Sequence, residues 1–378
     1  MRKKLLFIVN ADWFFLSHRL PIALEAMKQG YEVHLAAGIT DKHSELLSHG
    51  LIVHPVDIGR SSLNPISGVH TFFSLLKIIK AVRPDIVHLV TIKPVTLGGI
   101  AARMARVPSI VAAISGLGFV FLNKGPKAVA VRAGVAGLYQ LALGHKDLKV
   151  IFQNPDDRAT LMQAARLPIE KTTMIKGSGV DLSLYSAKPP PQGKPVVVMA
   201  ARLLRDKGVC EFVAAAQLLK QRGVNAKFWL VGDPDPGNPA TITNTEMKSW
   251  QQEGSVELLG RRSDIPDIFA QSHIVVLPSY REGLPKVLVE AAACGRAVVT
   301  TDVPGCRDAI EPGITGVLVP PRNAVALADA IERLLNDPDQ MKKMGEAGRQ
   351  LAEREFAIEK IVAEHLRIYR ELGLGSGE

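Results

Sequence analysis

Cysteine, aromatic side chains and long apolar runs are all scarce in this chain of 378 residues. The three cysteines, Cys210, Cys294 and Cys306, lie far apart and form no CxxC pair, which argues against a disulfide framework and a zinc site and favours a reducing cytosol. Aromatic residues make up 5% of the chain and are not interleaved with basic ones, as single-strand nucleic-acid binding would require. We therefore expect no nucleic-acid partner.

No stretch is long enough to cross a membrane. The longest mostly apolar stretch, residues 109–122, is shorter than the roughly 20 residues that a spanning helix needs. The basic start MRKKLLFIVNADW has only a short apolar core before Asn10 and Asp12, so we expect no signal peptide. A net charge of +9 favours an anionic partner, such as an acidic membrane face or a phosphorylated ligand.

Short β-branched apolar runs alternate with helical patterns along the whole chain. Because these runs are apolar throughout, they predict strands buried on both faces of parallel sheets. The proline-rich segment 186–195 interrupts the series and predicts a linker between two domains. One larger sheet with a surface loop at 186–195 is the alternative.

We therefore expect an α/β fold with two doubly wound, Rossmann-like domains whose strand ends face each other across a central cleft. The expected first domain covers residues 1–187. The second covers 188–355. A C-terminal helical segment, 356–378, is expected to cross back to the first domain.

Two glutamates, Glu282 and Glu290, follow an apolar run in the stretch REGLPKVLVE. Pro285 suits a first helical turn, which places Glu282 in a strand-to-helix turn and Glu290 on the second turn of the helix. Carboxylates accept hydrogen bonds from sugar diols, and the N–H groups of a helix start favour phosphate, so the pattern suits a nucleotide-sugar. A simple helix cap and a surface glutamate are the alternative.

Positive charge follows another apolar strand, in AARLLRDKGV (200–209). Arg202 suits bidentate phosphate contacts and Lys207 supplies a point charge, so together they can neutralise a leaving diphosphate. An ordinary solvated basic turn is the alternative.

These motifs resemble, in their order, those of the retaining GT-B glycosyltransferases of family four. EGLPKVLVEA resembles the E-x7-E element of that family, and the other matches keep the family's order through the second half. They are GSGVD (177–181), ARLLRDKG (201–208), LVGD (230–233), DIPDIFAQSHIVVLPS (264–279), EGLPKVLVEAAACGRAVV (282–299) and VPGCRDAIEPGITGVLVPP (303–321).

The resemblance implies that the first domain, 1–187, binds the acceptor and that the second, 188–355, binds the nucleotide-sugar. It also implies the catalytic and donor-binding roles. Arg202 and Lys207 would hold the donor diphosphate, and Glu282 would hold the transferred sugar. The reaction implied is a same-face attack, in which the leaving phosphate oxygen helps to take the acceptor proton.

The resemblance also implies contacts from the following turn and helix. The backbone N–H groups of Gly283 and Leu284 would lie beside the β-phosphate. Glu290 would hold the ribose hydroxyls.

Candidates in the first half follow its predicted strands. His18 and Arg19 lie where a strand-turn-helix can present them to the cleft, and Lys93 follows the strand IVHLV. Ser115 and Gly116 begin the turn SGLGF, whose glycines permit a ligand to approach the backbone closely. A local helix cap at His18 and a plain turn at SGLGF are the alternatives.

Many family members carry a histidine where this chain has Ser115, so another group must do the work of that histidine here. His88 lies inside the apolar strand IVHLV, which favours a buried structural role over a catalytic one. The first strand is not followed by GxGxxG, which argues against an NAD enzyme.

The stretches GRSSLNP (59–65), SHRLP and SGLGF are most similar to bacterial transferases that extend sugars on undecaprenyl diphosphate, in particular N-acetylgalactosaminyl α-1,3-transferases. Segments 71–83 and 124–146 combine apolar and basic residues, as helices that lie on anionic membranes do. Ordinary packing of these helices on the sheet is the alternative. We expect a cytoplasmic protein bound peripherally to the inner membrane.

Asp233 and Asp235 form a D-x-D pattern between prolines, which predicts a turn rather than a metal site. Since Arg202 and Lys207 supply the positive charge, we expect neither a metal nor a cofactor. The expected reaction transfers a hexosyl unit, N-acetylhexosaminyl by resemblance, from a UDP-sugar to a polyprenyl-diphosphate-linked saccharide.

Two other functions fit the same pattern. A nucleotide-sugar epimerase of the same fold would release free UDP and a rearranged sugar with no acceptor present. A non-catalytic carbohydrate-binding protein would bind the donor without turnover.

Overall fold

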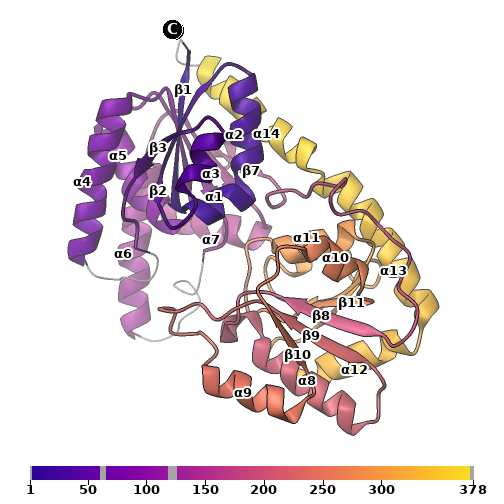
Figure 1. The fold of residues 1–378 in the computed structure, drawn as a ribbon. Coiled ribbons are helices and arrows are strands. Elements are labelled where there is room, and N and C mark those ends of the chain that lie inside the picture. The colour runs from indigo at the N-terminus through magenta and orange to yellow at the C-terminus, as the bar shows by residue number, and fades with distance from the viewer. Residues whose placement is uncertain (1, 60–64, 118–125, 375–378) are drawn as a thin grey trace. The chain divides into compact units, whose positions relative to one another are not determined.

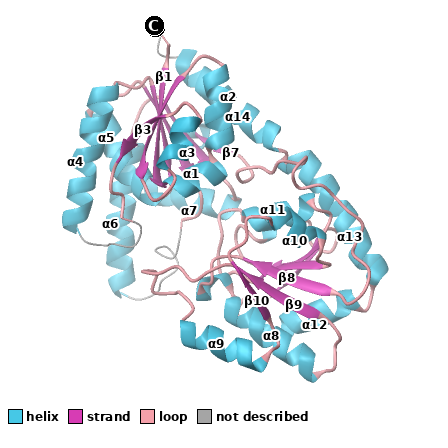
Figure 2. Ribbon diagram, in the orientation of Figure 1, coloured by secondary structure: helices cyan, strands magenta, loops and turns pink. Residues whose placement is uncertain are grey.

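The structure is a computed structural model that describes residues 2–59, 65–117 and 126–374. It divides into two compact units, Met1–Ser178 with Glu359–Glu378, and Gly179–Ile358. Each unit has a parallel sheet between layers of helices, so the expected pair of doubly wound α/β domains is confirmed (Figures 1 and 2). Most of GRSSLNP and the end of SGLGF lie outside the described residues.

In the described part of unit 1, seven strands pair in the order β3-β2-β1-β4-β5-β6-β7. The strands are β1 (Lys4–Ala11), β2 (Glu32–Gly38), β3 (Ile52–Pro55), β4 (Ile86–Val90), β5 (Ser109–Ile114), β6 (Leu148–Phe152) and β7 (Thr172–Met174). The helices are α1 (Asp12–His18), α2 (Leu20–Lys28), α3 (His43–Ser48), α4 (Pro65–Val82), α5 (Gly99–Met104), α6 (Pro126–Leu143), α7 (Pro155–Ala165) and α14 (Ile358–Leu374).

Alternate residues of the unit 1 strands face different helix layers, since side chains along a strand alternate between the two faces of the sheet. Leu6 and Ile8 of β1 share a buried core with Leu75 of α4. Phe7 points the other way and contacts Phe15 of α1 and His88 of β4. The strand is therefore buried on both faces, as its continuous apolar sequence predicts.

In the described part of unit 2, six strands pair in the order β10-β9-β8-β11-β12-β13. The strands are β8 (Val196–Ala200), β9 (Lys227–Val231), β10 (Glu257–Gly260), β11 (Ile274–Leu277), β12 (Ala297–Thr301) and β13 (Gly316–Val319). The helices are α8 (Val209–Gln221), α9 (Asn244–Glu253), α10 (Ile265–Ala270), α11 (Lys286–Ala293), α12 (Ala324–Leu335) and α13 (Pro338–Leu351).

The segment 179–195 belongs to unit 2 because its backbone is bound there. Val180 donates to the carbonyl of Phe356 at 2.9 Å and accepts from Ile358 N at 3.0 Å. Arg349 of α13 donates to the carbonyl of Tyr185 at 2.8 Å. The division between the units, at Gly179, comes before the proline-rich segment 186–195. The expected domain limits, which rest on that segment, stay a prediction.

None of the helices in the described ranges is long and apolar enough to pass through a bilayer.

Candidate functional site

The residues expected to bind the donor lie at one edge of the unit 2 sheet. The strand order reverses between β8 and β11, and ligands of doubly wound sheets bind at the carboxyl ends of the strands at such a point. Arg202 and Lys207 follow β8, and Glu282 follows β11. The sheet topology thus brings these three residues to the same edge.

Lys207 and Glu282 are in direct contact. The Lys207 ammonium donates to Oε1 of Glu282 at 2.5 Å, and the Ser279 hydroxyl donates to the same oxygen at 2.7 Å. The Lys207 and Glu282 side chains are only 21% and 12% exposed. Within the described ranges, the other carboxylate oxygen, Oε2, has no hydrogen-bond or ion-pair partner. It remains able to accept hydrogen bonds from ligand hydroxyls.

Ser279 was not among the site residues expected from the sequence. It is fully buried two residues after the end of β11, and its carbonyl accepts a hydrogen bond from the Thr301 hydroxyl. Its hydroxyl fixes the orientation of the Glu282 carboxylate. A serine three positions before a glutamate is too common a pattern to mark such a contact in a sequence.

The turn after β8 is packed against the turn after β11. Tyr280 N donates to the carbonyl of Asp206 at 2.9 Å. Gly208 has φ +77°, and a Cβ there would lie 2.1 Å from the carbonyl oxygen of Pro278. Only glycine fits this close approach of two backbones, which holds Lys207 beside Glu282.

A third loop, after β12, packs against the Glu282 turn and supports it. Glu282 N donates to the carbonyl of Pro304 at 3.1 Å. Gly305 has φ +83°, and a Cβ there would lie 2.4 Å from the Glu282 carbonyl oxygen and 2.6 Å from that of Gly283. Any other residue at this position must displace the backbone of the Glu282 turn.

We expect Gly305→Ala to weaken donor binding by more than about tenfold, because the added Cβ pushes the Glu282 turn away. Gly313→Ala is a matched control, since Gly313 also has a positive φ (+78°) but a Cβ there meets nothing within 4 Å. The backbone cost of a left-handed alanine is roughly 1–2 kcal/mol in both variants. Thermal unfolding and titration with UDP separate the two effects. Equal donor affinity in both variants would contradict the proposed support.

Arg202 forms an ion pair with Asp235, at 2.5 Å from Nη1 to Oδ2. The Arg202 side chain is 47% exposed, and its remaining N–H groups have no protein partner in the described part of the chain. Asp233, the other carboxylate of the D-x-D pattern, instead accepts from Arg261 N at 3.2 Å. Groups of three or more metal-ligating side chains do not occur among the described residues.

Glu290 lies on α11 and is 8% exposed. Burial raises the pKa of its carboxyl, while Lys286, 3.6 Å away, opposes that rise. Its carboxylate also contacts the Tyr185 hydroxyl. Helix α11 begins at Lys286, directly after Pro285, as the sequence predicts. Glu290 therefore sits on the first turns of the helix that follows Glu282.

The backbone expected beside the β-phosphate belongs to Gly283 and Leu284, which are both buried in the turn before α11. Their roles, like those of the side chains above, stay predictions.

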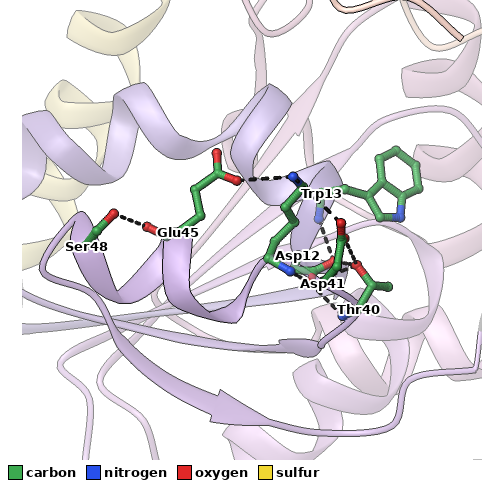
Figure 3. A network of polar contacts seen from close by, with 7 residues as sticks. Asp12, Trp13, Thr40, Asp41, Glu45 and Ser48 are labelled. Atoms are coloured by element: carbon green, nitrogen blue, oxygen red, sulfur yellow. Dashed lines mark hydrogen bonds and ion pairs between the residues drawn. The ribbon is translucent and has the colours of Figure 1, made fainter.

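A buried carboxylate organises the loops at the corresponding edge of unit 1. Asp12 accepts hydrogen bonds from Trp13 N at 2.7 Å, Thr40 N at 2.6 Å and Lys42 N at 3.3 Å, and from the Thr40 hydroxyl (Figure 3). These bonds lower the pKa of Asp12 against the opposing effect of burial. The carboxylate thus ties the loop after β2 to the start of α1.

His18 is the last residue of α1 and Arg19 follows it, but the two differ in exposure. His18 is partly exposed, stacks on Phe14 at 4.1 Å between ring centroids and contacts the Ser17 hydroxyl at 2.5 Å. Arg19 is 2% exposed and donates to the Ser115 hydroxyl at 3.4 Å. Burial lowers the pKa of Arg19 to about 10. The structure therefore brings Arg19 and Ser115 together inside the unit.

Lys93 follows β4 and donates to the carbonyl of Gly59. Burial lowers the pKa of its ammonium. Thr91, two residues earlier, has φ +75°, which is a rare conformation for a β-branched residue. Gly116, after β5, has φ +105°. Glycine adopts such a φ without strain, whereas the strained backbone of Thr91 is of a kind that clusters at ligand-binding sites.

His88 is buried within β4, as expected from its apolar neighbours. Its Nδ1 contacts the Tyr369 hydroxyl at 2.5 Å, and its ring stacks on His365 at 5.7 Å between centroids. Both partners belong to α14, which therefore packs on the unit 1 sheet. His88 therefore connects this helix to the sheet.

Two family models match the chain. Residues 4–154 match the "Glycosyl transferase 4-like" family, and residues 185–351 match "Glycosyl transferases group 1". Similar solved structures include sucrose-phosphate synthase from Thermosynechococcus elongatus, with a TM-score of 0.80 and 23% identity over 99% of this chain and 100% of that one. Another is Anabaena HepE in complex with UDP and glucose, with a TM-score of 0.77 and 21% identity over 98% and 100%.

Among curated proteins, the chain is 34% identical over 344 residues to N,N'-diacetylbacillosaminyl-diphospho-undecaprenol alpha-1,3-N-acetylgalactosaminyltransferase of Campylobacter jejuni, covering 85% of this chain and 89% of that protein. It is 26% identical to UDP-Gal:alpha-D-GlcNAc-diphosphoundecaprenol alpha-1,3-galactosyltransferase of Escherichia coli, over 73% of each. The chain is therefore a glycosyltransferase of the GT-B fold and belongs to family four.

Proposed function

We propose that this glycosyltransferase moves a hexosyl unit, of the N-acetylhexosaminyl type, from a UDP-sugar to a polyprenyl-diphosphate-linked saccharide in the assembly of a bacterial surface glycan. One observation carries the choice of acceptor: the Campylobacter relative, named for a diphospho-undecaprenol acceptor, is similar over 85% of this chain. The Escherichia coli relative is also named for an acceptor on diphosphoundecaprenol.

The donor would bind at the carboxyl ends of β8 and β11. An ammonium has three donors, and Lys207 uses one of them on Glu282, so the others can reach the diphosphate. Arg202 would add a bidentate contact with its free N–H groups. Glu282 would accept from the sugar hydroxyls through Oε2, and Glu290 from the ribose.

Transfer would retain the anomeric configuration. Catalysis would come from holding the two reactants together and from stabilising the leaving diphosphate with fixed cations. This scheme needs no metal ion and no cofactor, because the UDP-sugar is itself a substrate. The acceptor would bind to unit 1, at the edge where His18, Lys93 and Gly116 follow their strands.

The test is incubation with a panel of UDP-sugars and a short polyprenyl-diphosphate-linked saccharide, with products identified by mass. A new acceptor product one hexosyl unit heavier supports the proposal. Free UDP and a rearranged sugar in the absence of acceptor would identify an epimerase instead. Donor binding without turnover for the whole panel would identify a binding protein.

Helices α4 and α6 would place the enzyme on the cytoplasmic face of the membrane. On α4, Val69 and Phe73 are 55% and 61% exposed, and Lys77 and Lys80 are exposed further along the same face. Four apolar residues of α6 are also more than 40% exposed: Val129, Val131, Leu138 and Leu141. Both helices pack against α5. Exposed apolar side chains with flanking cations suit an anionic bilayer.

We expect Phe73→Glu to reduce co-flotation with vesicles of anionic phospholipid at least about fivefold, since it replaces an apolar contact with a charge of the wrong sign. Ile314→Glu is the control, because Ile314 is 59% exposed in unit 2 and should not touch the bilayer. Added salt should weaken the flotation of the wild type. Salt-independent flotation, or equal loss in both variants, would contradict this surface.

A further inference from the structure

The turn that carries the D-x-D pattern lies against the Arg202 turn. Leu203 N donates to the carbonyl of Asp233 at 2.9 Å, and Arg205 N donates to the carbonyl of Ala240 at 2.8 Å. Asp235 N is itself bound to the Thr241 hydroxyl at 2.9 Å. These bonds fix the backbone of Asp235 relative to the backbone of Arg202.

The side chains of the two turns then meet in one ion pair. The Asp235 side chain is 21% exposed, and its Oδ2 accepts a hydrogen bond from Nη1 of Arg202 at 2.5 Å. The other guanidinium N–H groups have no partner within the described ranges and are free to bind two oxygens of one ligand. An ion pair that is half exposed contributes little to stability, so stability does not explain its geometry.

A neighbouring ion pair offers a comparison. Arg205, in the same turn as Arg202, pairs with Glu246 of α9 at 2.6 Å, with side chains 48% and 28% exposed. Glu246 also closes the N-terminal cap of α9 through Thr243. The two pairs have the same chemistry and similar exposure, but only Arg202 is expected to reach the donor.

We propose that Asp235 is a positioning residue that holds the Arg202 guanidinium with its free edge toward the donor diphosphate. This inference rests on the proposed donor site. A long arginine side chain loses rotamer entropy when it binds a ligand, and a fixed partner on Nη1 removes part of that cost in advance. The D-x-D pattern then serves an arginine and not a metal ion.

The test compares Asp235→Ala, Asp235→Asn and Glu246→Ala in donor kinetics at saturating acceptor. We expect Asp235→Ala to lower kcat/KM for the donor about tenfold, mainly through a higher KM. Asp235→Asn should stay within about threefold of the wild type, because its amide oxygen still accepts from Nη1. Glu246→Ala should stay within about twofold.

A double-mutant cycle separates positioning from a structural role. In an Arg202→Ala background, Asp235→Ala should cause no further loss, because there is no guanidinium left to position. An equal loss in that background would overturn the proposal, since it would assign Asp235 a role in the loop alone. Unchanged or improved kinetics of Asp235→Ala would also overturn it, because Asp235 would then compete with the donor.

Calorimetric titration with UDP measures donor binding alone, so it tests this inference separately from the proposed reaction. Asp235→Ala should weaken UDP binding about fivefold, whichever sugar or acceptor the enzyme uses. If the wild type transfers no sugar but binds UDP in this Asp235-dependent way, the reaction is wrong and the positioning role stands. Equal UDP affinity of the wild type and Asp235→Ala would refute the positioning role.

Discussion

Glu282→Ala is expected to lower kcat/KM for sugar transfer by about a hundredfold or more, and Lys207→Ala by at least about thirtyfold, or ~2 kcal/mol of transition-state stabilisation. The alanine at 282 removes the carboxylate oxygen that is free to accept from the donor sugar. The alanine at 207 removes both the charge beside the diphosphate and the hydrogen bond that orients Glu282. Steady-state kinetics with a saturating acceptor measure both effects.

Glu282→Gln keeps the shape of the side chain but replaces one accepting oxygen with a donor, so it tests the role of that oxygen alone. The amide oxygen can still accept from Lys207 and Ser279, but the other position now carries an NH₂ group that donates. We therefore expect Glu282→Gln to lose activity nearly as far as Glu282→Ala while keeping a melting temperature close to that of the wild type. Activity near the wild-type level in Glu282→Gln would show that Oε2 accepts no hydrogen bond from the donor.

The Lys220–Glu253 pair is the control for both substitutions. It joins the same residue types in the same unit at 3.3 Å, with side chains 53% and 38% exposed. Lys220→Ala and Glu253→Ala should leave transfer within about twofold of the wild type. Kinetics within twofold for Lys207→Ala and Glu282→Ala as well would refute the donor site.

Much of this fold was accessible from the sequence because parallel strands between two helix layers must be apolar on both faces. The runs VVVMA and IVVL predict buried strands, and they form β8 and β11. The short strand β7, TTM, could not be predicted from an apolar run, because none of its residues is fully buried and its threonines give no apolar signal. Helix α11 was predictable from Pro285 before it and Gly295 after it.

The sequence predicts candidate site residues, but it does not predict the contacts between them. A motif gives the position of Lys207 and of Glu282, yet the bond between them spans 75 residues and depends on the pairing of β8 with β11. The same holds for Arg202 and Asp235, which two adjacent turns bring together. Long-range pairing is a property of the sheet order, which no local pattern encodes.

Arg19 is a candidate residue whose exposure could not be predicted from the sequence. The sequence predicts that a strand-turn-helix presents Arg19 to the cleft, but the side chain is buried. Burial of an arginine without a carboxylate partner is rare. Its guanidinium donates to the His18 carbonyl at 2.9 Å and to the Ser115 hydroxyl at 3.4 Å, and neither partner carries a charge. Arg19 interacts electrostatically with His365 and Tyr369 of α14, from the far end of the chain, and no local pattern predicts that proximity.

Acid is expected to destabilise unit 1, because two histidines are buried there in the neutral form. Burial and the nearby charge of Arg19 lower the pKa of His365 from 6.5 to about 3. Burial, then His365 and Arg19, lower the pKa of His88 well below 6.5. Below pH 6.5 the unfolded chain takes up protons at these positions that the folded chain does not, so stability falls as the pH falls.

The size of the effect follows from the unfolded pKa. For His365, the folded state stays neutral down to about pH 3, so lowering the pH from 7 to 5 costs about 2 kcal/mol in the free energy of unfolding. His88 acts in the same direction. Urea unfolding at pH 7 and pH 5, followed by circular dichroism, measures the total.

His365→Phe isolates one of the two groups, because phenylalanine has a similar ring and takes up no proton. We expect the variant to lose about 2 kcal/mol less than the wild type between pH 7 and pH 5. His43→Gln is the control, since His43 is exposed on α3 and should leave the pH dependence unchanged. An equally steep pH dependence in His365→Phe and in the wild type would mean that folded His365 binds its proton, contrary to its burial between α14 and the sheet.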